Sequence, residues 1–210
     1  EMLPANAIVY GNKGKLLRFD TAEHPVAVQI GGSDPEILSK AAKICEEFGY
    51  DEINLNVGCP SPKVKKGRFG ACLMFEPSLV KDCLQAMINA TKIPISVKCR
   101  IGVDEMDEIS GLDEFIDTII ETKISKVIIH ARKAYLKGLN PKQNRDVPPL
   151  NYERVRLLKE RLNNQIKIIV NGGINSVEKA ENLLEWADGV MIGREAVSYT
   201  HLRAHETVVH

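Results

Sequence analysis

Short apolar runs with the character of strands alternate with amphipathic segments of helical period along most of the chain. The seven strand candidates are residues 1–10, 26–32, 53–57, 93–99, 126–130, 166–170 and 188–192. Strands that alternate with helices form βαβ units, in which successive strands are parallel and helices cover the sheet. The sequence therefore predicts an α/β protein built on a parallel sheet.

Polar or glycine residues that could carry chemistry follow most of these strands. They are Gln29, Cys59, Lys98, His130, Asn171 and Gly193. An open doubly wound sheet places its ligand at one switch point, whereas a barrel uses the loops after many strands. We therefore predict a (β/α)8 TIM barrel, with the doubly wound sheet as the alternative. The barrel is expected to be incomplete, because seven strand candidates stand where eight are needed.

Capping residues mark the starts of three predicted helices. Ser33 with Glu36 three residues later has the pattern of a capping box, and Asn151 and Ser176 are further N-cap candidates. The strands between the helices are expected to be nearly continuous apolar runs, because a parallel sheet is covered on both faces.

Composition limits the class of protein. The chain has 28 basic and 28 acidic residues, which argues against a protein that coats nucleic acid but allows a local basic patch. We recognise no signal peptide and no apolar run near the roughly 18 residues of a membrane span. The five cysteines show no metal-binding spacing, so we predict a reduced, cytoplasmic protein without a metal.

Residues 54–74 combine several features of a site. The strand breaks at Gly58, and Cys59 follows on a loop bounded by prolines. The cations after it suit a polyanionic partner. These are Lys63, Lys65, Lys66 and Arg68. The alternative interpretation is an incidental thiol on a solvated basic loop.

The last two strands are followed by NGGI at 171–174 and by Gly193-Arg194. Glycine amides and a short helix N-terminus hold phosphate at this position in barrels, and an arginine adds a charge-assisted contact. Lys98 and His130 end successive strands, where they could hold an electron-rich ring or a phosphate. The carboxamide of Gln29 could pair with an imide edge such as that of a flavin or uracil.

Four motifs together resemble the bacterial tRNA-dihydrouridine synthases, and most closely the subgroup that acts on D-loop uridines 20/20a. They are GCPSPKVKKGRFGACLM, VKCRIG, IIHARKAYLKGLNPKQNRDVPPLNY and NGGI…DGVMIGRE. The resemblance covers about residues 1–196. It implies a TIM-barrel domain with a C-terminal helical domain, and an FMN-dependent, NAD(P)H-driven reduction of the uridine C5=C6 bond in tRNA. A monomer is also implied.

The resemblance assigns roles to individual residues. Cys59 matches the catalytic proton donor to C5, and Asn56 matches a residue beside the base. The FMN-binding positions match Gln29, Lys98, His130, Asn171, Gly172, Gly173, Gly193 and Arg194. The tRNA-contacting positions of the subgroup match Lys142, Asn144 and Arg145.

The sequence departs from the family pattern at both ends. The first strand, with its Pro-Met motif, has no counterpart, and residues 197–210 match neither the last barrel helix nor the helical domain. We therefore expect a partial FMN-binding barrel over 1–196, an unmatched and non-native tail over 197–210, and no C-terminal tRNA-binding domain. Such a chain is expected to retain FMN weakly and to have little activity.

Two other functions fit parts of the sequence. One is a flavin-dependent oxidoreductase that acts on a free pyrimidine, similar to dihydroorotate dehydrogenase. The basic run 63–68 and the KQNR loop argue against it, because a free base needs no cations along a phosphate backbone. The other is a non-catalytic barrel fragment that binds RNA or phosphate, in which Cys59 is inert.

Overall fold

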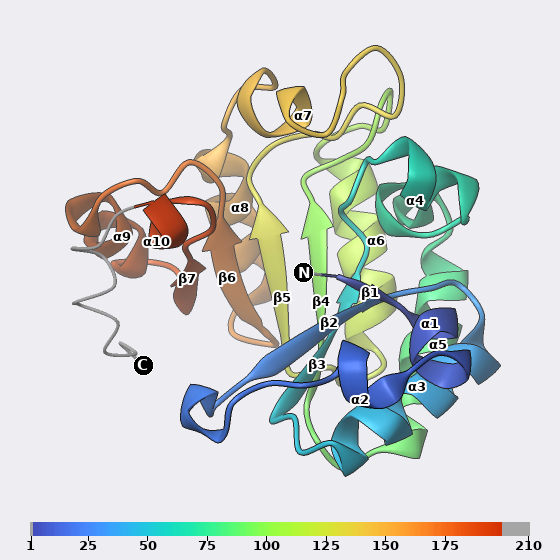
Figure 1. Cartoon of the computed structure of the whole chain (residues 1–210). Helices are drawn as coiled ribbons and strands as arrows, with labels where there is room; N and C mark the ends of the chain where they lie inside the picture. The colour runs from blue at the N-terminus through green and yellow to red at the C-terminus, as the bar shows by residue number, and fades with distance from the viewer. Residues whose placement is uncertain (1, 199–210) are drawn as a thin grey trace.

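The computed structural model describes residues 2–198, and its centre is a parallel sheet whose strands follow the order of the chain (Figure 1). The strands are β1 Leu3–Pro4, β2 Ala27–Gly31, β3 Glu52–Asn56, β4 Ile95–Arg100, β5 Lys126–His130, β6 Lys167–Asn171 and β7 Gly189–Met191. Each strand is hydrogen-bonded to the next, in the order β1-β2-β3-β4-β5-β6-β7. A doubly wound sheet requires a reversal of strand order, so that alternative is wrong. The fold is an incomplete TIM barrel, as predicted.

Helices follow the strands and cover the outer face of the sheet. They are α1 Ala5–Tyr10, α2 Lys13–Leu16, α3 Pro35–Glu47, α4 Pro62–Lys66, α5 Pro77–Ala90, α6 Ser110–Ile120, α7 Gln143–Asp146, α8 Tyr152–Leu162, α9 Val177–Leu184 and α10 Glu195–Ser198. Two 3-10 helices, η1 Thr21–Glu23 and η2 Gly70–Phe75, complete the set of described helices. Figure 1 shows α3, α5 and α6 packed in succession, with the short α4 and α7 at the C-terminal ends of the strands.

Apolar and polar side chains alternate in β3 and β4, whereas β5 and β6 have the continuous apolar runs that we predicted, at residues 127–129 and 168–170. In β3, Ile53 and Leu55 are fully buried in the core beneath the helices. Glu52, Asn54 and Asn56 alternate with these two residues along the strand and therefore point to the inner face. The inner face of the sheet is therefore polar along β3 and β4.

The N-terminal ten residues differ from the predicted strand. Only Leu3–Pro4 pairs with β2, and the chain then turns into α1. Ala5 and Ile8 are three residues apart and both buried, which is the apolar stripe of a helix. The three-residue spacing therefore prevails over the strand-like composition.

The helix starts agree with two of the three predicted caps. The side chains of Asn151 and Ser176 accept hydrogen bonds at the starts of α8 and α9, as predicted. At α3, however, the cap is Asp34 rather than Ser33. Pro35 favours the first helical position, so the helix begins one residue later than the capping-box pattern indicated.

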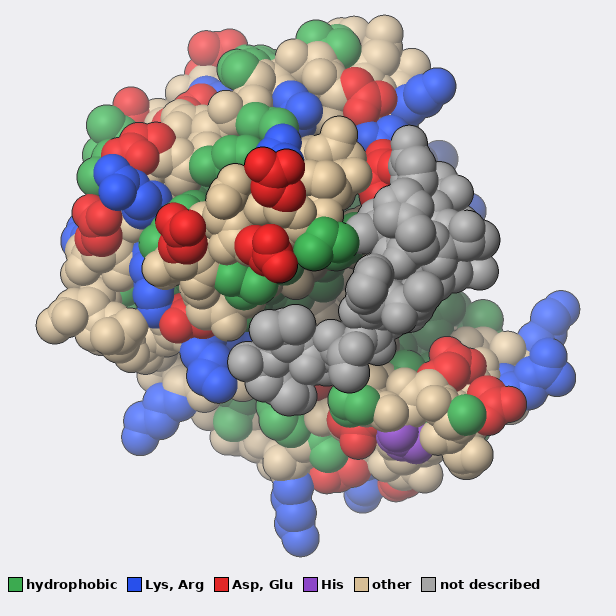
Figure 2. All heavy atoms as spheres, turned by 90° about the vertical axis from the view of Figure 1, so that its left-hand side faces the viewer, with side chains coloured by type: hydrophobic (Ala, Val, Ile, Leu, Met, Phe, Trp, Pro, Cys, Tyr) green, Lys and Arg blue, Asp and Glu red, His purple; other side chains and the backbone are tan. Residues whose placement is uncertain are grey.

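The outer surface carries charges of both signs. Figure 2 shows the left-hand side of Figure 1, where acidic and basic side chains are interspersed among the described residues. None of the helices between residues 2 and 198 is long and apolar enough to cross a membrane. The predicted tail reaches beyond this range: residues 199–210, with His201, His205 and His210, lie outside the described residues.

Candidate active site

The predicted site residues gather at one edge of the sheet. Gln29 lies on β2, Lys98 on β4 and His130 at the end of β5, while Cys59 follows β3. Because the strands are parallel and adjacent, their C-terminal ends lie at the same edge. This edge also bears α4 and the segment that contains α7 (Figure 1).

The Cys59 loop is held from two sides. The Oδ1 atom of Asn56 accepts hydrogen bonds from the backbone N–H groups of Gly58 at 3.1 Å and Cys59 at 2.9 Å. The Cys59 carbonyl accepts from the Ala71 N–H at 2.9 Å. Gly70 permits this closure, because its φ is +76° and a Cβ there would lie 2.5 Å from the Cys59 carbonyl oxygen. Asn56, predicted to lie beside the substrate, thus also shapes the turn that presents the thiol.

Arg100 ties this loop to the segment after β5, and sequence reasoning missed its role. Its Nε donates to the Gly58 carbonyl at 3.2 Å, and its Nη1 donates to the Asn144 carbonyl at 2.9 Å. The side chain is buried and has no carboxylate partner in the part of the chain that the structure describes, and burial lowers its pKa to about 10. The alternation in VKCRIG could have revealed it, because Arg100 follows Lys98 by two residues and so shares its face.

Lys98 on β4 reaches across the interior to Asn171 on β6, another predicted FMN-binding residue. Its Nζ donates to Oδ1 of Asn171 at 2.9 Å, and Nδ2 of Asn171 donates to the Met191 carbonyl at 2.8 Å. Burial, reinforced by nearby Arg100, lowers the pKa of Lys98 to about 8. Lys98 and Asn171 therefore link β4, β6 and β7 across the polar interior.

His130 is a buried, neutral imidazole. Burial first, and then the positive charges of Arg100 and Lys98, lower its pKa to about 2. The ring packs against the backbone of Gly172, which has a φ of +110°, and any Cβ at that position would overlap the imidazole. A neutral ring offers one N–H donor and one acceptor rather than a positive charge.

The buried state of His130 predicts a pH dependence of stability. In the unfolded chain an ordinary histidine binds a proton near pH 6.5, whereas the folded protein does not until about pH 2. Below about pH 6.5 the unfolded state therefore binds more protons than the folded state. The contribution of His130 to the free energy of unfolding is fully present above that pH and decreases as the pH falls. Between pH 7 and pH 5 we expect His130 to account for a loss of about 2 kcal/mol.

Urea unfolding of the parent and of His130→Gln at the two pH values measures this term. The neutral glutamine should remove about 2 kcal/mol of the pH-dependent difference, while the carboxylates contribute equally to both proteins. An identical pH dependence in the two proteins would show that His130 becomes protonated in the folded state.

The proposed phosphate-binding positions lie after β6 and β7. Gly172 and Gly173 both have positive φ, at +110° and +64°, and a Cβ on Gly193 would meet open space. Nη2 of Arg194 forms an ion pair at 2.7 Å with Asp146, which belongs to α7. This pair lowers the pKa of Asp146 and connects the β7 end to the segment after β5.

The three predicted tRNA-contacting residues do not share one environment. Lys142 and Arg145 are exposed, but Asn144 is fully buried. The Oδ1 atom of Asn144 accepts from the Tyr135 N–H at 2.7 Å, and its Nδ2 donates to the Tyr135 carbonyl at 2.9 Å. Asn144 therefore shapes the segment that carries the two cations, and its side chain is not on the surface.

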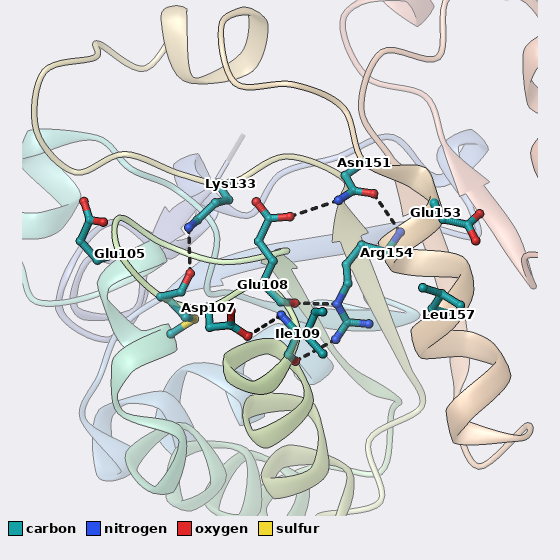
Figure 3. A pocket seen from close by; sticks show the side chains of 10 residues that line it. Glu105, Asp107, Glu108, Ile109, Lys133, Asn151, Glu153, Arg154 and Leu157 are labelled. Atoms are coloured by element: carbon teal, nitrogen blue, oxygen red, sulfur yellow. Dashed lines mark hydrogen bonds between the residues drawn. The ribbon is translucent and has the colours of Figure 1, made fainter.

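A cavity of about 560 Å³ lies away from this mouth, outside the barrel, between residues 105–109 and α8 (Figure 3). Figure 3 shows that its polar groups bind one another: Lys133 donates to the Met106 carbonyl, and Arg154 to the carbonyls of Glu108 and Ile109. These bonds brace the loop after β4, and we place the chemistry at Cys59 instead.

The fold and these residues define a TIM-barrel protein whose candidate chemistry lies at the C-terminal ends of its strands. The chain belongs to the dihydrouridine synthase (Dus) family, whose model matches residues 1–210, which confirms the resemblance. It is 52% identical over 197 residues to the tRNA-dihydrouridine(20/20a) synthase of Xanthomonas axonopodis pv. citri, covering 93% of this chain and 58% of that protein.

Proteins of the same name from other bacteria are similarly related. The Shewanella oneidensis protein is 51% identical over 204 residues, covering 97% of this chain and 60% of its own length. The Vibrio cholerae protein is 50% identical over 205 residues, with coverages of 97% and 62%. The chain thus spans about three-fifths of the length of these curated relatives.

Proposed function

We propose that this chain carries the catalytic barrel of a tRNA-dihydrouridine synthase, which reduces the C5=C6 bond of a D-loop uridine at position 20 or 20a. The observation that supports it most is the placement of Cys59 by Asn56 at the mouth that also contains Gln29 and Lys98. The proposal is also supported by relatives with the name tRNA-dihydrouridine(20/20a) synthase, which are 51 to 52% identical to this chain over most of its length.

The residues at the mouth fit FMN as the cofactor. Within residues 2–198, Lys98 donates one hydrogen bond, to Asn171, so its ammonium retains donors for an electron-rich ring. The positive-φ backbone at Gly172 and Gly173 is suited to a phosphate, and Gly193 leaves open space beside it. The chemistry that FMN would supply here is a hydride for C6 of the base, with NADPH or NADH as the reductant.

The protein residues supply the proton and the geometry. Reduction of the double bond needs a hydride at C6 and a proton at C5, and the Cys59 thiol is the proposed source of that proton. The thiolate that remains then regains a proton from solvent. Asn56 and Arg100 hold the backbone on which Cys59 stands, so the thiol is positioned before the substrate arrives.

A uridine in folded tRNA must leave its stack to reach this mouth. Lys63, Lys65 and Lys66 are exposed on α4, and Arg145 is exposed on α7. Both helices lie at the C-terminal ends of the strands (Figure 1). We propose that these cations follow the phosphate backbone, and that the protein acts as a monomer in the cytoplasm, where its substrate is found.

Measuring dihydrouridine in D-loop tRNA tests the function. The product of the full coding sequence is incubated with FMN, NADPH and unmodified tRNA, and dihydrouridine is quantified by mass spectrometry. We expect product from tRNA and none from free uracil or orotate. Equal reduction of a free pyrimidine would favour the dihydroorotate dehydrogenase-like alternative, and failure to bind FMN would favour a non-catalytic scaffold.

A further inference from the structure

A hydrogen-bonded chain of side chains crosses the inner face of the sheet and ends at the Cys59 loop. At its first end, Ser96 Oγ donates to Glu52 Oε1 at 2.5 Å. Nδ2 of Asn54 then donates to Ser96 Oγ at 2.8 Å, and Nε2 of Gln29 donates to Asn54 Oδ1 at 2.8 Å. These bonds connect three neighbouring strands.

The same chain continues through Asn56. Its Nδ2 donates to Oε1 of Gln29 at 2.7 Å, and its Oδ1 accepts the backbone N–H groups of Gly58 and Cys59. A continuous path of hydrogen bonds thus runs from the carboxylate of Glu52 to the backbone of the proposed proton donor.

Strand register places the members of this chain together. Glu52, Asn54 and Asn56 alternate along β3 and therefore share one face. Gln29 on β2 and Ser96 on β4 are the register partners of Asn54 on either side. Lys126 on β5 forms an ion pair with Glu52 at 2.6 Å, which anchors the far end.

The two ends of the chain determine the orientation of every amide between them. A carboxylate can only accept, so Ser96 must donate to Glu52 and accept from Asn54. The backbone N–H groups at the other end can only donate, so Asn56 must turn its oxygen toward Cys59. Reversing the Gln29 amide would set two donors face to face at one end and two acceptors face to face at the other, and both hydrogen bonds would be lost.

We propose that Ser96 and Asn54, anchored by Glu52, are positioning residues for this site. They hold the Gln29 carboxamide and the Cys59 loop in one orientation. In that orientation Gln29 retains one N–H and one oxygen lone pair side by side, the pattern that pairs with an imide edge. The role toward the cofactor rests on the proposed function, whereas the role toward Cys59 rests on the hydrogen bonds alone.

The test replaces Ser96 and a matched serine that lies off the chain. Ser96→Ala interrupts the path between Glu52 and Asn54. Ser125→Ala removes a comparable hydroxyl. The Oγ atom of Ser125 donates at 2.9 Å to the carbonyl of Ile95, which lies on β4 beside Ser96. Ser96→Ala loses two hydrogen bonds and Ser125→Ala loses one, so Tm should decrease in both variants and does not by itself separate the two roles.

Two readouts do separate them, and neither requires tRNA. The first is the rate at which Cys59 reacts with iodoacetamide, with Cys59→Ala defining the contribution of the other thiols. The second is the Kd for FMN by fluorescence quenching. For Ser96→Ala we expect Cys59 to react at least about threefold faster and FMN to bind about fivefold more weakly, since a lost buried hydrogen bond is worth about 1 kcal/mol.

Ser125→Ala should change each quantity by less than twofold. If Ser96→Ala fails to fold, Glu52→Gln keeps the shape but replaces the carboxylate that can only accept from Ser96, so it weakens the anchor of the chain and should alter both quantities in the same direction. Cys59 reactivity and FMN affinity equal to those of the Ser125 control would overturn the proposal. An altered thiol rate in a protein that forms no dihydrouridine would instead overturn the proposed function and leave the positioning role intact.

Discussion

Cys59→Ala should lower the rate of dihydrouridine formation in tRNA by about 10²- to 10⁴-fold, the contribution of a positioned general acid. The backbone bonds from Asn56 and Ala71 to residue 59 do not involve the thiol, so the loop should keep its shape. FMN affinity and reduction of bound FMN by NADPH should therefore remain close to the parental values. Mass spectrometry of the tRNA gives the first quantity, and flavin absorbance gives the second.

A second cysteine supplies the control for this experiment. Cys72 lies in η2, and its thiol donates to the Phe69 carbonyl at 3.2 Å. Cys72→Ala should form dihydrouridine at nearly the parental rate. Equal product from Cys59→Ala and the parent would remove Cys59 as the proton donor while retaining the flavin reductase.

Arg100→Met should lower the rate of dihydrouridine formation by about 100-fold although the side chain is not the proposed proton donor. Arg100 joins the Gly58 carbonyl to the Asn144 carbonyl, so its loss releases the Cys59 loop from the segment after β5. A displacement of about 1 Å at a reacting group is sufficient for an effect of that size.

Stability should change much less than activity in this variant. The carbonyls of Gly58 and Asn144, left unpaired, cost about 2 to 6 kcal/mol in total, and the longer bond from Arg100 to the Lys133 carbonyl at 3.4 Å adds little. Burial lowers the pKa of Arg100 to about 10, so removing the buried cation relieves a penalty of about 3 kcal/mol. The two terms largely cancel, and we expect urea unfolding to show a net loss of about 1 kcal/mol.

Arg156→Met is the matched control, because Arg156 is exposed on α8 and pairs with Glu153 and Glu160. Surface ion pairs contribute about 0 to 1 kcal/mol, so neither activity nor stability should change measurably. Parental activity in Arg100→Met would show that the Cys59 loop is positioned without this tether.

The sequence alone determined the class of fold and the edge of the sheet that bears the candidate site. Alternating strands and helices require parallel strands, and parallel strands in chain order bring their C-terminal ends together. Cys59, Lys98 and His130 could therefore be placed at one edge before any contact was known. Two helix caps were also local enough to read, because Asn151 and Ser176 bond within their own first turn.

Only the tertiary structure decided which side chains touch. The bonds from Glu52 through Ser96 and Asn54 to Gln29 depend on the register of three strands, and they join residues that are 25 to 44 positions apart. The burial of individual polar side chains was likewise decided by the tertiary structure. It makes His130 neutral, turns Arg100 inward to two carbonyls, and removes Asn144 from the surface, because each depends on the packing of segments distant in sequence.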